Sequence, residues 1–172
     1  MPQREPPTTQ EAISAVAQAR DSQARVTTSR GDIVFSFYPD DAPLTVASFI
    51  KLARGRFYDG LTFHRVVPGF VIQGGCPEGT GSGGPGYQLK AEFNARSHVA
   101  GTVAMARSQS PDSAGSQFYI CLEDATFLDK QYTVFGQVTA GMDVVKQIKV
   151  GDVMTKISIE PTNSTETRRA NT

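Results

Sequence analysis

The sequence contains little of what several classes of protein require. Its 172 residues include two cysteines, two histidines and no tryptophan. Two cysteines cannot build a disulfide framework, so Cys76 and Cys121 are expected to be free thiols in a reducing compartment. The cysteines and the two histidines, His64 and His98, are isolated along the chain and lack the spacing of metal ligands, so no metal site is expected.

The sequence also lacks a net charge and a long apolar run. Its 17 basic and 17 acidic residues cancel, so no global field attracts nucleic acid or an anionic membrane, and neither partner is expected. No stretch approaches the roughly 18 apolar residues of a membrane span. Residues 1–10 lack the apolar core of an export signal. We therefore expect a cytoplasmic protein, and we expect it to be a monomer.

The length and composition predict one main domain with short additions at both ends. Residues 1–24 form an N-terminal extension, with a proline-rich, disordered start and a short amphipathic helix. Thr8 and Glu11 have capping-box spacing, and Ile13, Val16 and Ala17 make a narrow apolar stripe. The helix docks on the domain or contacts a partner, and docking is favoured. Residues 25–160 form the domain, and residues 161–172 a flexible polar tail.

The domain itself is predicted to be mainly β. Residues 25–38 have the alternation of a β-hairpin, and further short β-like runs occur at 98–106, 117–122, 132–138 and 153–160. Two helices are expected, at 43–54 and 141–150, the first capped by Asp40 or Asp41 and ended by Gly55. This pattern predicts an antiparallel barrel with helices over its ends. The core should include Phe35, Phe37, Phe63, Phe118 and Phe135.

The most informative stretch is FHRVVPGFVIQGG, residues 63–75. Its Pro68-Gly69 pair predicts a turn between two strands and places Arg65 on a strand among apolar residues. A buried unpaired guanidinium is costly, so Arg65 faces a depression that needs a fixed donor, or it is an exposed or ion-paired strand residue. From this stretch alone the second interpretation is at least as well founded as the first.

Several motifs together resemble those of the cyclophilin-type peptidyl-prolyl isomerases. Their sequences are more similar to bacterial members than to the eukaryotic cytosolic type. They are FHRVVPGFVIQGG at 63–75, GTGSGGPG at 79–86, GSQFYI at 115–120, FLD at 127–129 and VFGQV at 134–138. The resemblance runs from about residue 31 to residue 159. It implies a closed eight-stranded antiparallel barrel with two capping helices, isomerisation of Xaa-Pro bonds in protein substrates as a folding catalyst, and no cofactor.

The resemblance also implies roles for eleven residues at matching positions. Arg65 and Gln73 would be catalytic, with Arg65 donating to the prolyl nitrogen. The substrate-binding residues would be Phe70, Val71, Ala106, Arg107, Gln117, Tyr119, Phe127, Leu128 and Tyr132. The partners would be proline-containing polypeptides. Phe127 stands where many members have tryptophan, so cyclosporin-type cyclic peptides should bind with weakened affinity.

One question of register stays open in the sequence. A tight two-residue turn at Pro68-Gly69 would place Arg65 and Gln73 on opposite faces of the hairpin, where they could not share a site. The resemblance implies a wider connection that puts both on the outer face. The sequence alone does not choose between them.

Other functions have weaker support. His64 or His98 with Ser116 and an aspartate could form a hydrolytic triad, but the chain has no nucleophile elbow. His64 is better explained as a hydrogen-bonded structural residue, and His98 as a turn or strand-edge residue. The glycine-rich loop at 79–86 lacks the Gly-Lys-Ser/Thr ending of a phosphate-binding loop. The remaining alternative is a non-catalytic proline-peptide-binding or chaperone module that uses the same pocket.

Overall fold

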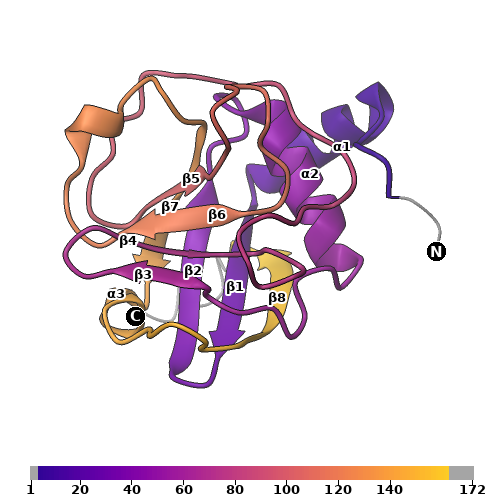
Figure 1. The fold of residues 1–172 in the computed structure, drawn as a ribbon. Coiled ribbons are helices and arrows are strands. Elements are labelled where there is room, and N and C mark those ends of the chain that lie inside the picture. Colours follow the sequence, from indigo (N-terminus) through magenta and orange to yellow (C-terminus); the bar gives the residue numbers. More distant parts are fainter. Residues whose placement is uncertain (1–3, 163–172) are drawn as a thin grey trace, which may run out of the picture.

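The computed structural model describes residues 4–162. Residues 1–3 of the predicted disordered start and residues 163–172 of the tail predicted at 161–172 lie outside this range, whereas Pro161 ends the last strand and is not part of a tail. The described chain is mainly β (Figure 1). Its strands are β1 (Ser22–Thr28), β2 (Gly31–Phe37), β3 (Arg65–Val67), β4 (Val71–Gly74), β5 (Thr102–Met105), β6 (Phe118–Cys121), β7 (Val134–Ala140) and β8 (Met154–Pro161). Its helices are α1 (Thr9–Ala19), α2 (Pro43–Arg54), the 3-10 helix η1 (Thr126–Leu128) and α3 (Met142–Val145).

The strands form one antiparallel sheet that curls into a half-barrel. Their order is β3-β4-β6-β5-β7-β2-β1-β8, so β3 and β8 lie at the two ends of the sheet. The expectation of a closed barrel is therefore not supported. The segments that precede the two end strands are linked by an isolated β-bridge, between Thr62 before β3 and Val153 before β8.

The concave side of the sheet holds an aromatic core. Phe35, Phe118 and Phe135 are fully buried and surround Phe49 of α2, with ring centroids 5.4 to 5.7 Å from the Phe49 centroid. Phe37 and Phe63 are buried too, so all five predicted core aromatics are confirmed. Helix α2 lies against this core, as a helix with a wide apolar face must.

The start of α2 differs from the prediction. Neither Asp40 nor Asp41 caps it, because the N-cap residue is Ala42 and Asp40 and Asp41 pair with Arg20 and Arg96. The Glu92 carboxylate, distant in the chain, instead accepts hydrogen bonds from the backbone N–H groups of Leu44 (3.1 Å) and Thr45 (2.7 Å). It serves as a cap supplied from another loop.

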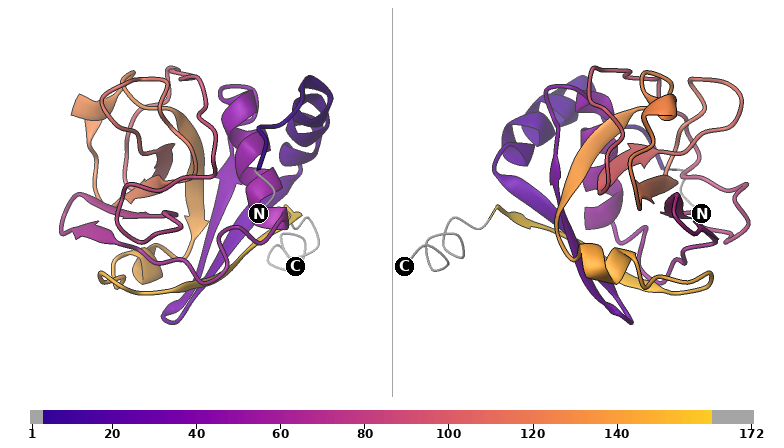
Figure 2. Two further views of the ribbon diagram at one scale, coloured as in Figure 1. Left: turned by 45° about the vertical axis from the view of Figure 1, so that its right-hand side comes forward. Right: turned by 90° about the vertical axis from the view of Figure 1, so that its left-hand side faces the viewer.

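Helix α1 lies on the outer side of α2 (Figures 1 and 2). Its capping box of Thr8 and Glu11 is as predicted. The buried face consists of Ala12, Ala15 and Ala19, whereas Ile13 is exposed, so the predicted stripe was wrong. Small residues at the contact allow the two helices to approach closely. The helix thus docks within the chain.

Two other elements are shorter than predicted. The helix expected at 141–150 covers only Met142–Val145 before turns follow, and the strand expected at 98–106 covers only Thr102–Met105. Among the described residues, no helix is long and apolar enough to cross a membrane.

Candidate active site

The register of β3 and β4 brings Arg65 and Gln73 together. The two residues pair across the strands, and Val67 pairs with Val71, so three residues, Pro68 to Phe70, connect the strands. Phe70 N–H donates to Val67 O at 3.0 Å, and Gly69 has the positive φ of 72° that this turn requires. Compared with a two-residue turn at Pro68-Gly69, the connection contains one more residue, Phe70, and this extra residue pairs Arg65 with Gln73. The wider connection implied by the family resemblance is the one observed.

Arg65 and Gln73 therefore face the same side, opposite to the fully buried Ile72. Arg65 Nη1 donates to Gln73 Oε1 at 3.2 Å. Within residues 4–162, Arg65 forms no ion pair with a carboxylate, and its side chain is exposed. The ion-paired interpretation of this arginine is thus not borne out, whereas the exposed strand position is confirmed, and Arg65 also borders a recess.

Arg65 and Gln73 border a small recess of about 170 Å³ in which nine of the eleven predicted residues meet. Its lining is Arg65, Phe70, Val71, Gln73, Ala106, Arg107, Tyr119, Leu128 and Tyr132. Val71 and Tyr119 are buried strand residues, while Leu128 and Tyr132 belong to the loop that contains η1. Strand residues thus form the floor and loop residues the wall of a small space whose lining mixes apolar and aromatic side chains with Arg65, Gln73 and Arg107.

Phe127 lies at the edge of the small recess rather than in its lining. Its ring stacks on Phe70, with centroids 5.7 Å apart and planes at 25°. The side chain is two-thirds exposed, which fits the predicted rim position.

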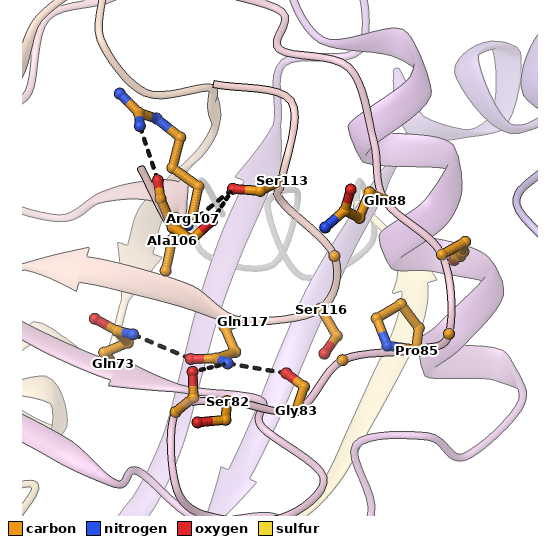
Figure 3. A pocket seen from close by; sticks show the side chains of 16 residues that line it. Gln73, Ser82, Gly83, Pro85, Gln88, Ala106, Arg107, Ser113, Ser116 and Gln117 are labelled. Atoms are coloured by element: carbon orange, nitrogen blue, oxygen red, sulfur yellow. Dashed lines mark hydrogen bonds between the residues drawn. The ribbon is translucent and has the colours of Figure 1, made fainter. Parts of the chain in front are cut away.

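The last predicted residue, Gln117, is joined to the recess through Gln73. Gln73 Nε2 donates to Gln117 Oε1 at 3.2 Å, and Gln117 Nε2 donates to the carbonyl oxygens of Gly81 (2.8 Å) and Gly83 (2.9 Å) (Figure 3). Each amide in the series Arg65–Gln73–Gln117 presents its oxygen to the preceding residue and its NH₂ group to the next. The chain of hydrogen bonds therefore sets both amide orientations.

A second, polar cavity of about 550 Å³ adjoins the small recess and shares Gln73, Ala106 and Arg107 with it. Its other walls are the glycine-rich loop and the segment before β6, including Ser82, Pro85, Ser113 and Ser116 (Figure 3). The glycine-rich loop is held from within by Cys76, whose Sγ accepts from the N–H groups of Gly81 and Gly83. The two openings form one continuous, extended surface.

Arg107 lines both openings, but its guanidinium is engaged by backbone carbonyl oxygens. Its guanidinium donates to the carbonyl oxygens of Gln131, Ser108 and Gln109 and, in Figure 3, points away from Gln117. It also lies over the Tyr132 ring. The sequence placed Arg107 among the substrate-binding residues, and the contacts of its side chain with Tyr132 and the carbonyl oxygens were not predicted.

Both histidines differ from their predicted roles. His64 has a buried Nδ1 atom without a hydrogen-bond partner in the described part of the chain, so it is not the hydrogen-bonded residue expected. Burial, and then the charge of Arg65, lower the pKa of His64. His98 is fully buried instead of lying at an edge, and it bonds to Asp129 and to the Tyr119 hydroxyl.

The hydrolytic triad around Ser116 does not form within residues 4–162. Ser116 is buried and donates its hydroxyl to Gly75 O at 2.7 Å, and both ring nitrogens of His98 are engaged elsewhere. Cys76 and Cys121 are buried free thiols, as predicted. Within residues 4–162, no cluster of three or more metal-ligating side chains occurs.

Comparison with known proteins gives one consistent family. Residues 23–168 match the family model described as cyclophilin type peptidyl-prolyl cis-trans isomerase/CLD. The chain is 53% identical over 130 residues to peptidyl-prolyl cis-trans isomerase B of Bacillus subtilis, covering 74% of this chain and 90% of that protein. It is 48% identical over 140 residues to a peptidyl-prolyl cis-trans isomerase of Synechococcus elongatus, covering 80% and 96%.

A solved structure gives the same fold. It is a cyclophilin type peptidyl-prolyl cis-trans isomerase from Cryptosporidium parvum, crystallised in the presence of the dipeptide Ala-Pro. The TM-score is 0.75 and the identity 27%, and the match covers 80% of this chain and 98% of that one.

Proposed function

The chain belongs to the cyclophilin-type family of peptidyl-prolyl cis-trans isomerases, and we propose that it catalyses isomerisation by hydrogen-bonding the Arg65 guanidinium to the prolyl nitrogen of the twisted peptide bond. The observation that carries this proposal is the Arg65 guanidinium at the edge of the small recess, which is hydrogen-bonded to Gln73 and forms no ion pair within the described residues. We further propose that its clients are flexible or unfolded protein segments, which makes it a folding catalyst.

The reaction needs a donor, a ring pocket and little else. Partial double-bond character imposes a barrier of roughly 18–20 kcal/mol on rotation about the peptide bond. During rotation that resonance is lost, and the prolyl nitrogen gains a lone pair that can accept a hydrogen bond. A donor that meets this nitrogen only in the twisted state lowers the barrier without tightening ground-state binding. Because no bond breaks, the mechanism requires no nucleophile, metal or cofactor.

Arg65 suits this task because its charge persists at any working pH and its planar donors are rigid. One of its nitrogens is held by Gln73, which restricts the side chain and leaves other donors for the substrate. Exposure weakens any electrostatic effect, but a bound substrate would cover the guanidinium and exclude water around it.

The two openings suggest how a peptide lies. We propose that the pyrrolidine ring enters the small recess, against Phe70, Tyr119 and Leu128, and that neighbouring residues extend across the polar cavity. Gln73 and Gln117 would hold the main chain there. The Ala-Pro dipeptide named with the Cryptosporidium parvum structure supports an Xaa-Pro ligand.

A protease-coupled isomerisation assay on a short Ala-Pro peptide tests the activity, and Arg65→Ala tests the mechanism. We expect kcat/KM to fall by about 10²–10³, as on removal of one oxyanion-type donor, with peptide affinity little changed. Arg54→Ala is the matched control, because Arg54 is on α2 and bonds to Gln18, away from the site. If affinity is lost while turnover persists, the chain is better described as a proline-peptide-binding or chaperone module.

A further inference from the structure

A buried histidine lies directly behind the small recess without lining it. His98 has no exposed surface, and its Nε2 lies 2.7 Å from the hydroxyl oxygen of Tyr119, a residue that lines the recess. On the other side of the ring, Nδ1 lies 3.0 Å from Asp129 Oδ1. The imidazole thus connects a partly exposed carboxylate to the polar end of a recess side chain.

The chemistry of the partners sets the direction of both hydrogen bonds. An ionised carboxylate only accepts, so the Nδ1 atom of His98 carries the proton and donates to Asp129. The lone pair on Nε2 then accepts from the Tyr119 hydroxyl. Desolvation lowers the pKa of His98 despite the opposing effect of Asp129, and burial raises the pKa of Tyr119, so both groups are neutral at pH 7.

The rings of this cluster are packed as well as bonded. The His98 ring stacks on Tyr119, with centroids 5.9 Å apart and planes at 16°. The Tyr132 ring meets His98 edge-on at 6.4 Å and Tyr119 edge-on at 5.7 Å. Both aromatic residues that flank His98 line the small recess. A shift of the imidazole would therefore move Tyr119 and Tyr132, two of the side chains that line the recess.

The backbone of His98 holds the recess wall. His98 N–H donates to Asp129 Oδ1 at 2.7 Å, and Ala125 N–H donates to His98 O at 2.9 Å. Ser97 Oγ donates to Asp129 Oδ2 at 2.6 Å. These bonds join the segment before β5 to the loop that contributes Leu128 and Tyr132.

We propose that His98 and Asp129 are positioning residues for substrate binding, which act by holding the Tyr119 ring and the η1 loop at the spacing that accepts a prolyl ring. Neither touches the substrate. The proposal rests on the small recess being the site for proline. It explains why a tyrosine can form the floor of a recess that accepts an apolar ring, since its hydroxyl hydrogen-bonds to His98 behind the recess.

A double-mutant cycle on wild-type protein, His98→Leu, Tyr119→Phe and the double variant tests the link, with isomerisation of an Ala-Pro peptide as the readout. Each single change leaves one buried polar group unpaired, so we expect each to lower kcat/KM by about tenfold, mainly through KM. The double variant removes both groups and should lose no more than the worse single variant. His98→Gln, which keeps an acceptor near the Nε2 position, should recover part of the loss.

Independent single-site effects would overturn the proposal. They would appear as a loss of about one hundredfold in the double variant, or as a fall in melting temperature with KM unchanged. Failure of wild-type protein to isomerise any Xaa-Pro peptide would instead overturn the proposed function. The two failures are therefore distinguishable.

A second pair of variants applies even if His98→Leu does not fold. Asp129→Ala removes the acceptor of Nδ1, whereas Asp124→Ala removes a nearby carboxylate that accepts from Ala100 N–H and does not contact His98. We expect KM to rise only in Asp129→Ala. Imidazole nitrogen resonances of wild-type protein should show a protonated Nδ1 and an unprotonated Nε2 for His98. Equal KM values in the two variants, or the opposite tautomer, would contradict the proposal.

Discussion

The Arg107 guanidinium lies over the ring of Tyr132, with Cζ 4.6 Å from the ring centroid. The same group donates to carbonyl oxygens of Ser108, Gln109 and Gln131, so it fastens the segment after β5 to the loop that ends at Tyr132. Arg107 thus shapes the wall of the small recess and leaves Arg65 as the cation that faces it.

Replacing Arg107 by alanine should weaken substrate binding. Loss of the cation–π contact and of the carbonyl hydrogen bonds frees the Tyr132 wall, and we expect KM to rise about 3–10-fold with kcat largely retained. Steady-state kinetics on an Ala-Pro peptide measures this. Arg96→Ala is a matched control, because Arg96 lies over Tyr38 in the same way, at 3.9 Å, outside both openings. A kcat effect equal to that of Arg65→Ala would show instead that Arg107 acts on the transition state.

Replacing Glu92 by alanine should destabilise the fold without changing turnover of the folded protein. Glu92 caps α2 through two backbone N–H groups and the Thr45 hydroxyl, and we expect a loss of about 1–2 kcal/mol in the free energy of unfolding. Urea denaturation measures the change. Asp40→Ala removes one of the two capping residues predicted from the sequence and should have a much smaller effect. A larger loss of stability in Asp40→Ala than in the Glu92 variant would refute the role of Glu92 as the cap.

The stability of the protein should fall as the pH is lowered below about 6.5, the unperturbed pKa of histidine. Burial lowers the pKa of both His98 and His64 in the folded state, so the unfolded chain binds more protons in this range. The stabilisation is therefore complete above pH 6.5 and is lost toward acid. Melting temperatures between pH 7.5 and 5.5 should decrease, and His98→Leu should flatten the slope. An unchanged slope in that variant would assign the effect to His64.

Cyclosporin-type cyclic peptides should bind weakly. Phe127 occupies a rim position where many family members have tryptophan, and its ring offers no N–H donor. An unmatched acceptor on the ligand costs about 1–3 kcal/mol, or roughly 5–150-fold in affinity. Phe127→Trp should recover part of this in a calorimetric titration. Nanomolar binding by the unmodified protein would disprove the prediction.

The sequence predicted which residues meet at the small recess better than it predicted the contacts that hold them. The family resemblance brought Arg65, Gln73 and the other recess residues together, because each lies in a short, distinctive segment that matches the family. The register of the central hairpin was not predictable, since a Pro-Gly turn fits connections of either length. The structure adds Phe70 to the connection and so resolves the question.

Contacts between distant segments escaped prediction altogether. Asp40 and Asp41 were natural caps for α2 by proximity, but Glu92 reaches the helix from a loop 47 positions after Thr45. His98 looked like an edge residue because nothing near it in the chain identifies Tyr119 and Asp129 as its partners. α3 ended early because turns begin after Val145, although the apolar spacing continues to Ile148.

The place of β3 at an open end of the sheet has a consequence for inactivation. Arg65 belongs to a three-residue strand that pairs with β4 alone among the described strands, whereas Tyr119 lies on β6 in the interior of the sheet. Short terminal segments detach at a lower free-energy cost than central ones. On warming, the guanidinium should therefore lose its alignment while the ring pocket persists, leaving molecules that still hold prolyl peptides but no longer turn them over.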